Sequence, residues 1–157
     1  MSDKCIYTAN DIANWFLNEN RIKINFEDSE YITNLKLQKL LYYAQGCYMA
    51  KYGKPLFNDD FLAWAHGPVI KSIYDKYKSN GASGIVYDED YKCNLDDETI
   101  DFLKKIDNYF GQYTAWKLRD MTHQELPWMN TRRNDIITKD LIKDFFINNT
   151  EYSCIYG

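Results

Sequence analysis

The chain lacks the clustered cysteines and histidines from which most zinc and iron–sulfur sites are built. Its two histidines, His66 and His123, are far apart in the sequence, and no two cysteines form a CxxC pair. The four cysteines stand singly, at Cys5, Cys47, Cys93 and Cys154. We therefore expect no bound metal ion, and we interpret the cysteines as reduced structural thiols.

Motifs for cofactors are also missing. The sequence has neither GxGxxG nor GxxxxGK[ST], the glycine-rich patterns that hold dinucleotides and nucleoside triphosphates. No run of lysine and arginine forms a basic stripe, and 19 basic against 23 acidic residues give a net charge of -4. Binding to nucleic acid is disfavoured, because that affinity comes largely from basic side chains that displace counterions. We expect no cofactor.

Long apolar runs are absent as well. No segment approaches the roughly 20 apolar residues that a membrane helix needs, and the first residues lack the continuous apolar run of a signal peptide. We therefore expect a cytoplasmic protein without membrane contact. The 157 residues contain no internal repeat, low-complexity tract or long linker, which predicts a single domain over residues 1–157.

Aromatic residues, by contrast, are plentiful. They make up 17% of the chain, with 14 Tyr, 8 Phe and 4 Trp, enough to fill a core and to leave some rings for an interface. The strongest helical segment runs from Thr33 to Tyr52, where two apolar stripes cover much of the circumference. Gly53 and Pro55 end it. We predict an all-α, mainly helical fold of six to seven helices packed around this central helix.

Local signals place the other elements. Capping residues indicate further helix starts at Thr8, Asp96, Thr114 and Thr138. The polar stretch from Asn18 to Glu30 is interpreted as a connecting loop. Pro68 suits the first position of a helix, because its missing N–H needs no partner there. Ile85–Tyr87 is predicted to be a short strand that pairs with the extended segment Phe61–Trp64 in a small β-hairpin.

Three short segments are candidates for function, and the first is Leu35–Gln45 on the central helix. It carries Gln38 and Tyr42 on a helix that the apolar stripes indicate is buried. A buried amide or phenol without a hydrogen-bond partner costs about 1–3 kcal/mol. These side chains therefore either fasten loops to the core, which is the favoured interpretation, or reach a groove that faces a partner.

The second segment is Ala63–Val69. Gly67 lets the backbone turn and Pro68 fixes the direction that follows, while Trp64 and His66 present aromatic surface at the joint. Such a turn is about as consistent with packing between elements as with a tryptophan-anchored interface.

The third segment is Thr122–Trp128, which holds the second histidine. His123 with Glu125 suggests acid–base chemistry, because histidine titrates near neutral pH. Neighbouring positions on a helix do not face one another, however, and no serine or cysteine nucleophile is placed beside them. A structural His123 bonded to the backbone is the favoured interpretation.

In this order and spacing the sequence resembles the Panacea-domain, or SocA-like, antitoxins, which often occur in phage and mobile-element neighbourhoods. The resemblance lies in ITNLKLQKLLYYAQ at residues 32–45, YGKPLF at 52–57, AWAHGPV at 63–69 with Tyr74, and HQELPW at 123–128. It covers most of the chain, from the first helix to about Trp128.

The resemblance implies an all-helical or nearly all-helical domain that neutralises a cognate toxin encoded nearby, normally by direct contact. One branch of the family resembles a proteolytic adaptor that delivers its toxin to a ClpXP-type protease. We therefore expect a protein-binding module and no enzyme, with Trp64, His66, Tyr74 and Trp128 shaping the contact surface.

Two alternatives remain open. One is an enzyme that uses His66 or His123 with Glu125 as acid–base groups. The other is a nucleic-acid-binding protein of phages or mobile elements, which would need a basic face that the linear sequence does not reveal. The basic residues considered for that face are Lys23, Lys36, Lys39, Lys51, Arg132 and Arg133.

Overall fold

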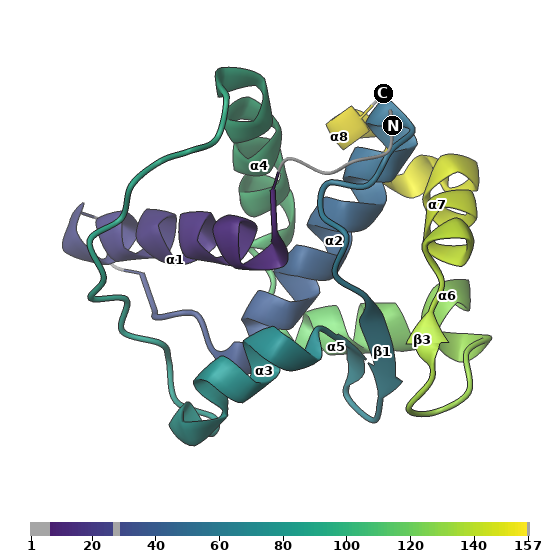
Figure 1. Cartoon of the computed structure of the whole chain (residues 1–157), viewed down its shortest axis with the longest axis horizontal. Helices are drawn as coiled ribbons and strands as arrows, with labels where there is room; N and C mark the ends of the chain where they lie inside the picture. Colours follow the sequence, from purple (N-terminus) through teal and green to yellow (C-terminus); the bar gives the residue numbers. More distant parts are fainter. Residues whose placement is uncertain (1–6, 27–28, 157) are drawn as a thin grey trace.

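A computed structural model describes residues 7–26 and 29–156 of the chain, and the predicted mainly helical fold is confirmed (Figure 1). The helices are α1 (Ala9–Phe26), α2 (Asn34–Tyr52), α3 (Lys71–Tyr77), α4 (Asp97–Phe110), α5 (Ala115–His123), α6 (Leu126–Met129), α7 (Lys139–Asn148) and α8 (Ser153–Tyr156). The strands are β1 (Phe61–Trp64), β2 (Gly67–Val69) and β3 (Ile136–Ile137), and short 3-10 turns cover Lys78–Asn80 and Thr150–Tyr152.

Helix α2 occupies the centre, as predicted. It runs between α1 and α4 on one side and α7 on the other (Figure 1), and it also contacts α3, α5 and α8. Thr33 caps its first turn by accepting a hydrogen bond from the Lys36 amide. Gly53, with φ of 79°, ends it in the left-handed conformation that glycine adopts without strain. All positions from Leu37 to Cys47 are buried, so the helix has no solvent-facing side over this stretch.

Capping signals located the helix starts correctly. Thr8 and Asp11 form a reciprocal capping box, each side chain accepting from the other's backbone amide. The side chains of Asp96, Thr114 and Thr138 likewise accept from amides of the first turns of α4, α5 and α7.

The prediction of a loop from Asn18 was wrong, because α1 continues to Phe26. The stretch holds no glycine or proline to stop a helix, and its polar residues form the outer side of one. Asn20 faces inward instead. Its side-chain amide donates to the Glu30 carbonyl at 2.9 Å and accepts from the Ile32 amide at 3.0 Å, which guides the chain into α2.

The small sheet is antiparallel with strand order β2-β1-β3. A turn at Ala65 and His66 brings Gly67 opposite Trp64, and Phe61 lies opposite Ile137. The prediction that Ile85–Tyr87 pairs with this segment was wrong. The nearer β2 closes a much shorter loop, which costs less entropy, and the Ile85 amide instead donates to the Ile32 carbonyl.

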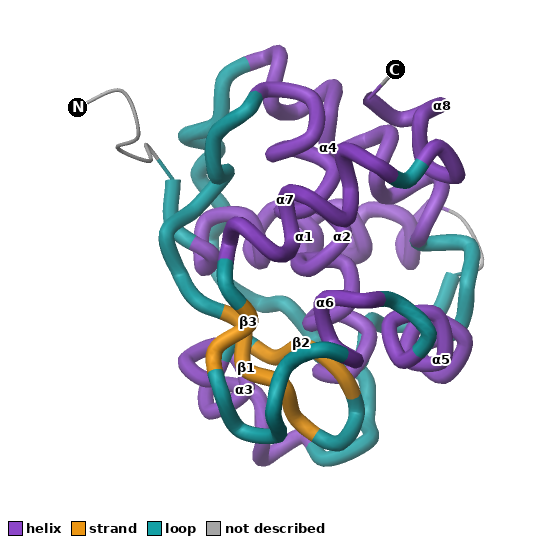
Figure 2. Tube along the Cα trace, turned by 90° about the vertical axis from the view of Figure 1, so that its right-hand side faces the viewer, coloured by secondary structure: helices purple, strands orange, loops and turns teal. Residues whose placement is uncertain are grey.

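Pro68 lies in β2 and does not begin a helix, contrary to prediction. Strand β2 is at the edge of the sheet, where a missing N–H leaves no ladder bond unmade. The three strands lie at the end of the molecule that also holds α3, α5 and α6 (Figure 2).

Two further findings concern the thiols and the membrane. Cys47 is buried and Cys93 is exposed, both as reduced cysteines, whereas Cys5 lies outside the described residues. Over residues 7–26 and 29–156, none of the helices combines the length and apolarity needed to span a bilayer.

Candidate partner-binding site

The segments singled out in the sequence meet at the sheet end of the molecule, where α2 holds the β1–β2 hairpin from beneath. The Gln38 side chain accepts from the Ile70 amide at 2.8 Å. At the next residue of α2, Lys39 Nζ donates to the Pro68 carbonyl at 3.1 Å. Gln38 is only 1% exposed and Lys39 is fully buried. Lys39 therefore attaches β2 to the central helix, and Gln38 attaches the residue that follows β2.

Lys39 is a buried cation without a carboxylate partner among the described residues. Burial, reinforced by the nearby positive charge of Arg119, lowers the pKa of its ammonium to about 7. Its inclusion in a basic face was wrong, because no part of the side chain reaches solvent. Lys36 also contributes little to a basic face, since its ammonium donates to the Gly111 carbonyl at 2.7 Å.

The hairpin turn lies directly on α2 and α5. Gly67 has φ of 109°, and a Cβ at this position would come within 2.7 Å of Thr122 Oγ1 and 2.8 Å of Lys39 Cε. Only glycine meets both requirements, a positive φ and no side chain. Gly67 and Pro68 are both buried, so they build the turn and present no surface of their own.

Glu125 lies beneath the surface, between α5 and α6. Its carboxylate accepts hydrogen bonds from the hydroxyls of Tyr43, at 3.0 and 3.1 Å, and Tyr152, at 2.7 Å. Burial raises its pKa to about 8, although the two hydroxyls act in the opposite direction. Glu125 therefore joins α2, α6 and the C-terminal turn in one hydrogen-bonded cluster.

His123 contacts a different group. Its ring stacks on Trp128 with centroids 3.9 Å apart and planes at 11°, and Trp128 Nε1 donates to the Trp64 carbonyl at 2.8 Å. Burial lowers the pKa of His123, which favours the neutral imidazole. The Arg133 guanidinium is 3.7 Å from the Trp128 ring centroid. Two groups this close cannot share one face of the indole, so His123 and Arg133 enclose it from opposite sides.

The acid–base alternative receives no support from this geometry. Glu125 is enclosed by two tyrosine hydroxyls, whereas His123 is stacked on an indole, and His66 is exposed on the hairpin turn. Within the described ranges, no three His, Cys, Asp or Glu side chains are close enough together to hold a metal ion.

Of the candidate residues, those that reach solvent surround the hairpin. Tyr74 is 36% exposed and packs edge-on against Trp64 with centroids 5.0 Å apart. Trp64 and Trp128 are half-buried, and His66 is exposed. Tyr42, by contrast, is completely buried, and its hydroxyl finds no partner in the described part of the chain. In this structure neither Tyr42 nor Gln38 is accessible to a partner.

Sequence reasoning missed Trp116 and Arg119, which extend the same surface on α5. Trp116 is 56% exposed, and Arg119 lies over its ring at 4.5 Å. A signal was available, because Trp116 falls outside the inner stripe of Ala115, Leu118 and Met121 that the helical period defines. A large aromatic residue on the outer side of a short helix marks an interface candidate.

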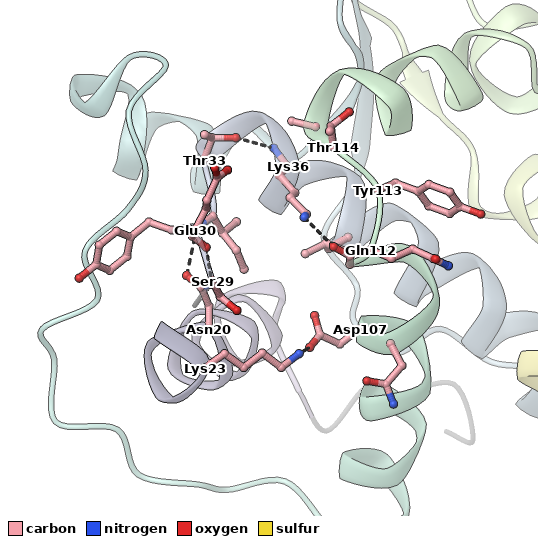
Figure 3. Close-up of a pocket in the computed structure, with 16 residues that line it drawn as sticks. Asn20, Lys23, Ser29, Glu30, Thr33, Lys36, Asp107, Gln112, Tyr113 and Thr114 are labelled. Atoms are coloured by element: carbon pink, nitrogen blue, oxygen red, sulfur yellow. Dashed lines mark hydrogen bonds and ion pairs between the residues drawn. The ribbon is translucent and has the colours of Figure 1, made fainter. Parts of the chain in front are cut away.

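A cavity of about 520 Å³ lies elsewhere, between α1, the start of α2 and the end of α4 (Figure 3). Lys23 forms an ion pair with Asp107 across it, and Lys36 reaches the Gly111 carbonyl. Its two cations are thus already engaged by groups of the protein. None of the candidate residues lines it, so the motifs and the cavity are separate features.

Comparisons with known proteins point to one family. The family described as "Antitoxin SocA-like, Panacea domain" matches residues 37–129, a range that includes every candidate residue named above. The curated protein Antitoxin SocA of Caulobacter vibrioides (strain NA1000 / CB15N) is 46% identical over 55 residues. That match covers 35% of this chain and 29% of the relative, so it spans less than a third of the relative's length. No solved structure matches the chain.

Proposed function

Because the chain belongs to the Panacea-domain family of SocA-like antitoxins, we propose that it is an antitoxin that neutralises, by direct contact, a toxin encoded by a neighbouring gene. The observation that carries this proposal is the family match over residues 37–129. That range holds α2, the β1–β2 hairpin, α5 and α6, the elements that the buried side chains of α2 tie together.

The contact surface that we propose is the exposed face of the hairpin and the adjoining helices. Trp64, His66, Tyr74 and Trp128 gather there from segments far apart in the sequence. Aromatic side chains of this kind supply much of the binding energy at protein interfaces. The other candidate residues support this face from within: Gln38, Tyr42, Gly67, Pro68, His123 and Glu125.

Co-expression with the adjacent gene tests the function. We expect expression of that gene alone to stop growth of the host, and we expect simultaneous expression of this protein to restore growth. The two proteins should co-purify. A neighbouring product that is harmless alone, or whose toxicity persists beside this protein, would contradict the proposal.

The fate of the toxin distinguishes a simple neutraliser from a proteolytic adaptor for a ClpXP-type protease. An adaptor shortens the lifetime of the toxin, and restoration of growth then requires the protease. A neutraliser protects cells equally well in a host without ClpP, and leaves the toxin lifetime unchanged or longer. We propose direct neutralisation, so loss of protection in a ClpP-deficient host would contradict that part of the proposal.

A further inference from the structure

We propose that His66, Trp116 and Arg119 form a subsite that binds a carboxylate side chain on an acidic segment of the partner protein. This inference rests on the proposed function and goes further, because it names the chemistry that the surface recognises. The three side chains come from two elements, the hairpin turn and α5.

The three side chains hold one another in place. Arg119 Nε donates to His66 Nδ1 at 3.1 Å, and the Arg119 guanidinium lies 4.5 Å from the Trp116 ring centroid. The His66 ring lies 5.8 Å from the Trp116 ring. An arginine that is fixed before binding loses less side-chain entropy when it pairs with a carboxylate.

The hydrogen-bond pattern leaves donors for an incoming acid. Because His66 Nδ1 accepts from Arg119, the proton of the neutral imidazole lies on Nε2. Arg119 Nη1 is engaged by Asp120 Oδ1 at 3.0 Å, which leaves Nη2 outside these two bonds. The Trp116 indole N–H can only donate. These groups suit an acceptor, and an ionised carboxylate is the strongest acceptor that a protein side chain offers.

The charges around the subsite also favour an anion. Lys39 lies buried beneath the turn, and its positive charge and that of Arg119 repel each other. His123 feels the same two cations, with Asp120 as the acidic group that opposes them. The side chain of Asp120 is 49% exposed. Solvent therefore screens its negative charge more strongly than it screens the charge of the buried Lys39 ammonium. Because the pKa of Lys39 is about 7, its ammonium is only partly charged at neutral pH, and the positive charge that an incoming carboxylate meets comes mainly from the Arg119 guanidinium.

A protein carboxylate fits this surface better than a nucleic-acid phosphate. Nucleic-acid binding needs several basic side chains along a backbone track, whereas here one arginine lies beside an exposed tryptophan. A partner segment with an acidic residue next to an apolar one would contact both side chains. Its carboxylate would pair with Arg119, and its apolar group would pack on Trp116.

A small carboxylate tests the chemistry without the partner. We would titrate the protein at constant ionic strength with N-acetylglutamic acid α-amide and with its glutamine counterpart, following the indole N–H signals by NMR. The signal that disappears in Trp116→Phe should shift with the glutamate compound and not with the glutamine compound, and Arg119→Gln should abolish the shift. No shift, or equal shifts with both compounds, would overturn the proposal. So would a response to duplex DNA without one to the glutamate compound.

Binding to the product of the neighbouring gene provides the second test. We expect Arg119→Gln and Trp116→Ala each to weaken binding about tenfold or more without lowering the melting temperature. Lys51→Gln is the matched control, because Lys51 also lies over an aromatic ring, that of Tyr52, at another exposed place. It should change binding less than twofold. If the wild-type protein does not bind that product, the proposed function fails. If it binds and the Arg119 and Lys51 variants bind equally well, only the subsite fails.

Discussion

Two buried ionisable side chains of opposite type lie within the family-matched region, and their surroundings differ. Lys39 Nζ has the Pro68 carbonyl as its partner, whereas the Glu125 carboxylate has two tyrosine hydroxyls. Burial disfavours the charged form of each. The pKa of Glu125 is therefore raised to about 8 and that of Lys39 is lowered to about 7. Both groups make the stability of the fold depend on pH, in opposite directions.

Glu125→Gln should remove the part of the pH dependence of stability that comes from Glu125. In the wild type the folded state keeps the Glu125 proton up to about pH 8, whereas the unfolded chain releases it near its ordinary pKa of 4.5. The stabilisation from this proton is complete below pH 4.5 and is lost as pH rises to about 8, by up to about 1.4 kcal/mol per pH unit. Urea unfolding from pH 4 to 9 measures it. Parallel stability profiles for wild type and variant would contradict the raised pKa.

Lys39→Met should remove the opposite dependence. The unfolded chain holds this proton up to the ordinary lysine pKa of 10.5, whereas the folded protein releases it near 7. The contribution is present above pH 10.5 and is lost as pH falls towards 7. We expect the stability of the wild type relative to the variant to rise between pH 8 and 10, where Glu125 no longer contributes. A difference that stays constant over this range would show that Lys39 titrates normally.

At the scale of elements, the packing of α2 against α7 depends on Gly46. A Cβ at this position would overlap the ring of Phe146 on α7. Glycine inside a helix ordinarily costs up to about 1 kcal/mol relative to alanine. Its presence in the middle of α2 is therefore explained by close packing, since any larger residue would separate the two helices.

Gly46→Ala should destabilise the protein, although helix propensity alone predicts the reverse. We expect a loss of about 1–3 kcal/mol in the free energy of unfolding, the usual cost of overfilling a packed core. Phe146→Leu in the same chain should make the combined loss smaller than the sum of the two single losses. Denaturant unfolding of all four proteins completes the cycle. A gain in stability from the single Gly46→Ala change would refute the close contact.

Elements with strong local signals were predictable from sequence. The course of α2 follows from its apolar stripes together with Thr33 and Gly53, and helix starts at Thr8 and Asp96 follow from side chains that satisfy free amides. These signals depend on residues within four positions of one another, so a linear sequence contains them.

Contacts between distant segments were not predictable in the same way. Strand β3 is two residues long and becomes a strand only by pairing with β1. The inward position of Asn20 depends in the same way on Glu30 and Ile32, ten or more residues later in the chain. The candidate site shows the same division. The motif residues were found, but Lys39 was treated as a surface cation because its burial depends on the hairpin that folds over it.

Across the whole molecule, the proposed function separates side chains that contact the partner from those that support the fold. His66→Ala removes an exposed group, so we expect weaker neutralisation with an unchanged melting temperature. Gln38→Ala leaves the buried Ile70 amide without its acceptor, at a cost of about 1–3 kcal/mol. It should lower the melting temperature while sparing partner affinity at temperatures where the variant is folded. Melting temperature and partner affinity would be measured for both variants. A lower melting temperature for His66→Ala, together with weaker binding for a folded Gln38→Ala, would contradict this assignment.

The attachment of the hairpin to α2 also bears on how a member of this family could acquire new partners. Gln38 and Lys39 hold the backbone of Pro68 and Ile70, and neither bond involves a side chain of the hairpin. Residues at exposed positions such as His66, Tyr74 and Trp116 can therefore be replaced without breaking the hydrogen bonds that attach the hairpin to α2. A library randomised at these positions could be selected against an unrelated toxin. The exposed side chains would then determine which protein is bound, and α2 would keep the fold unchanged.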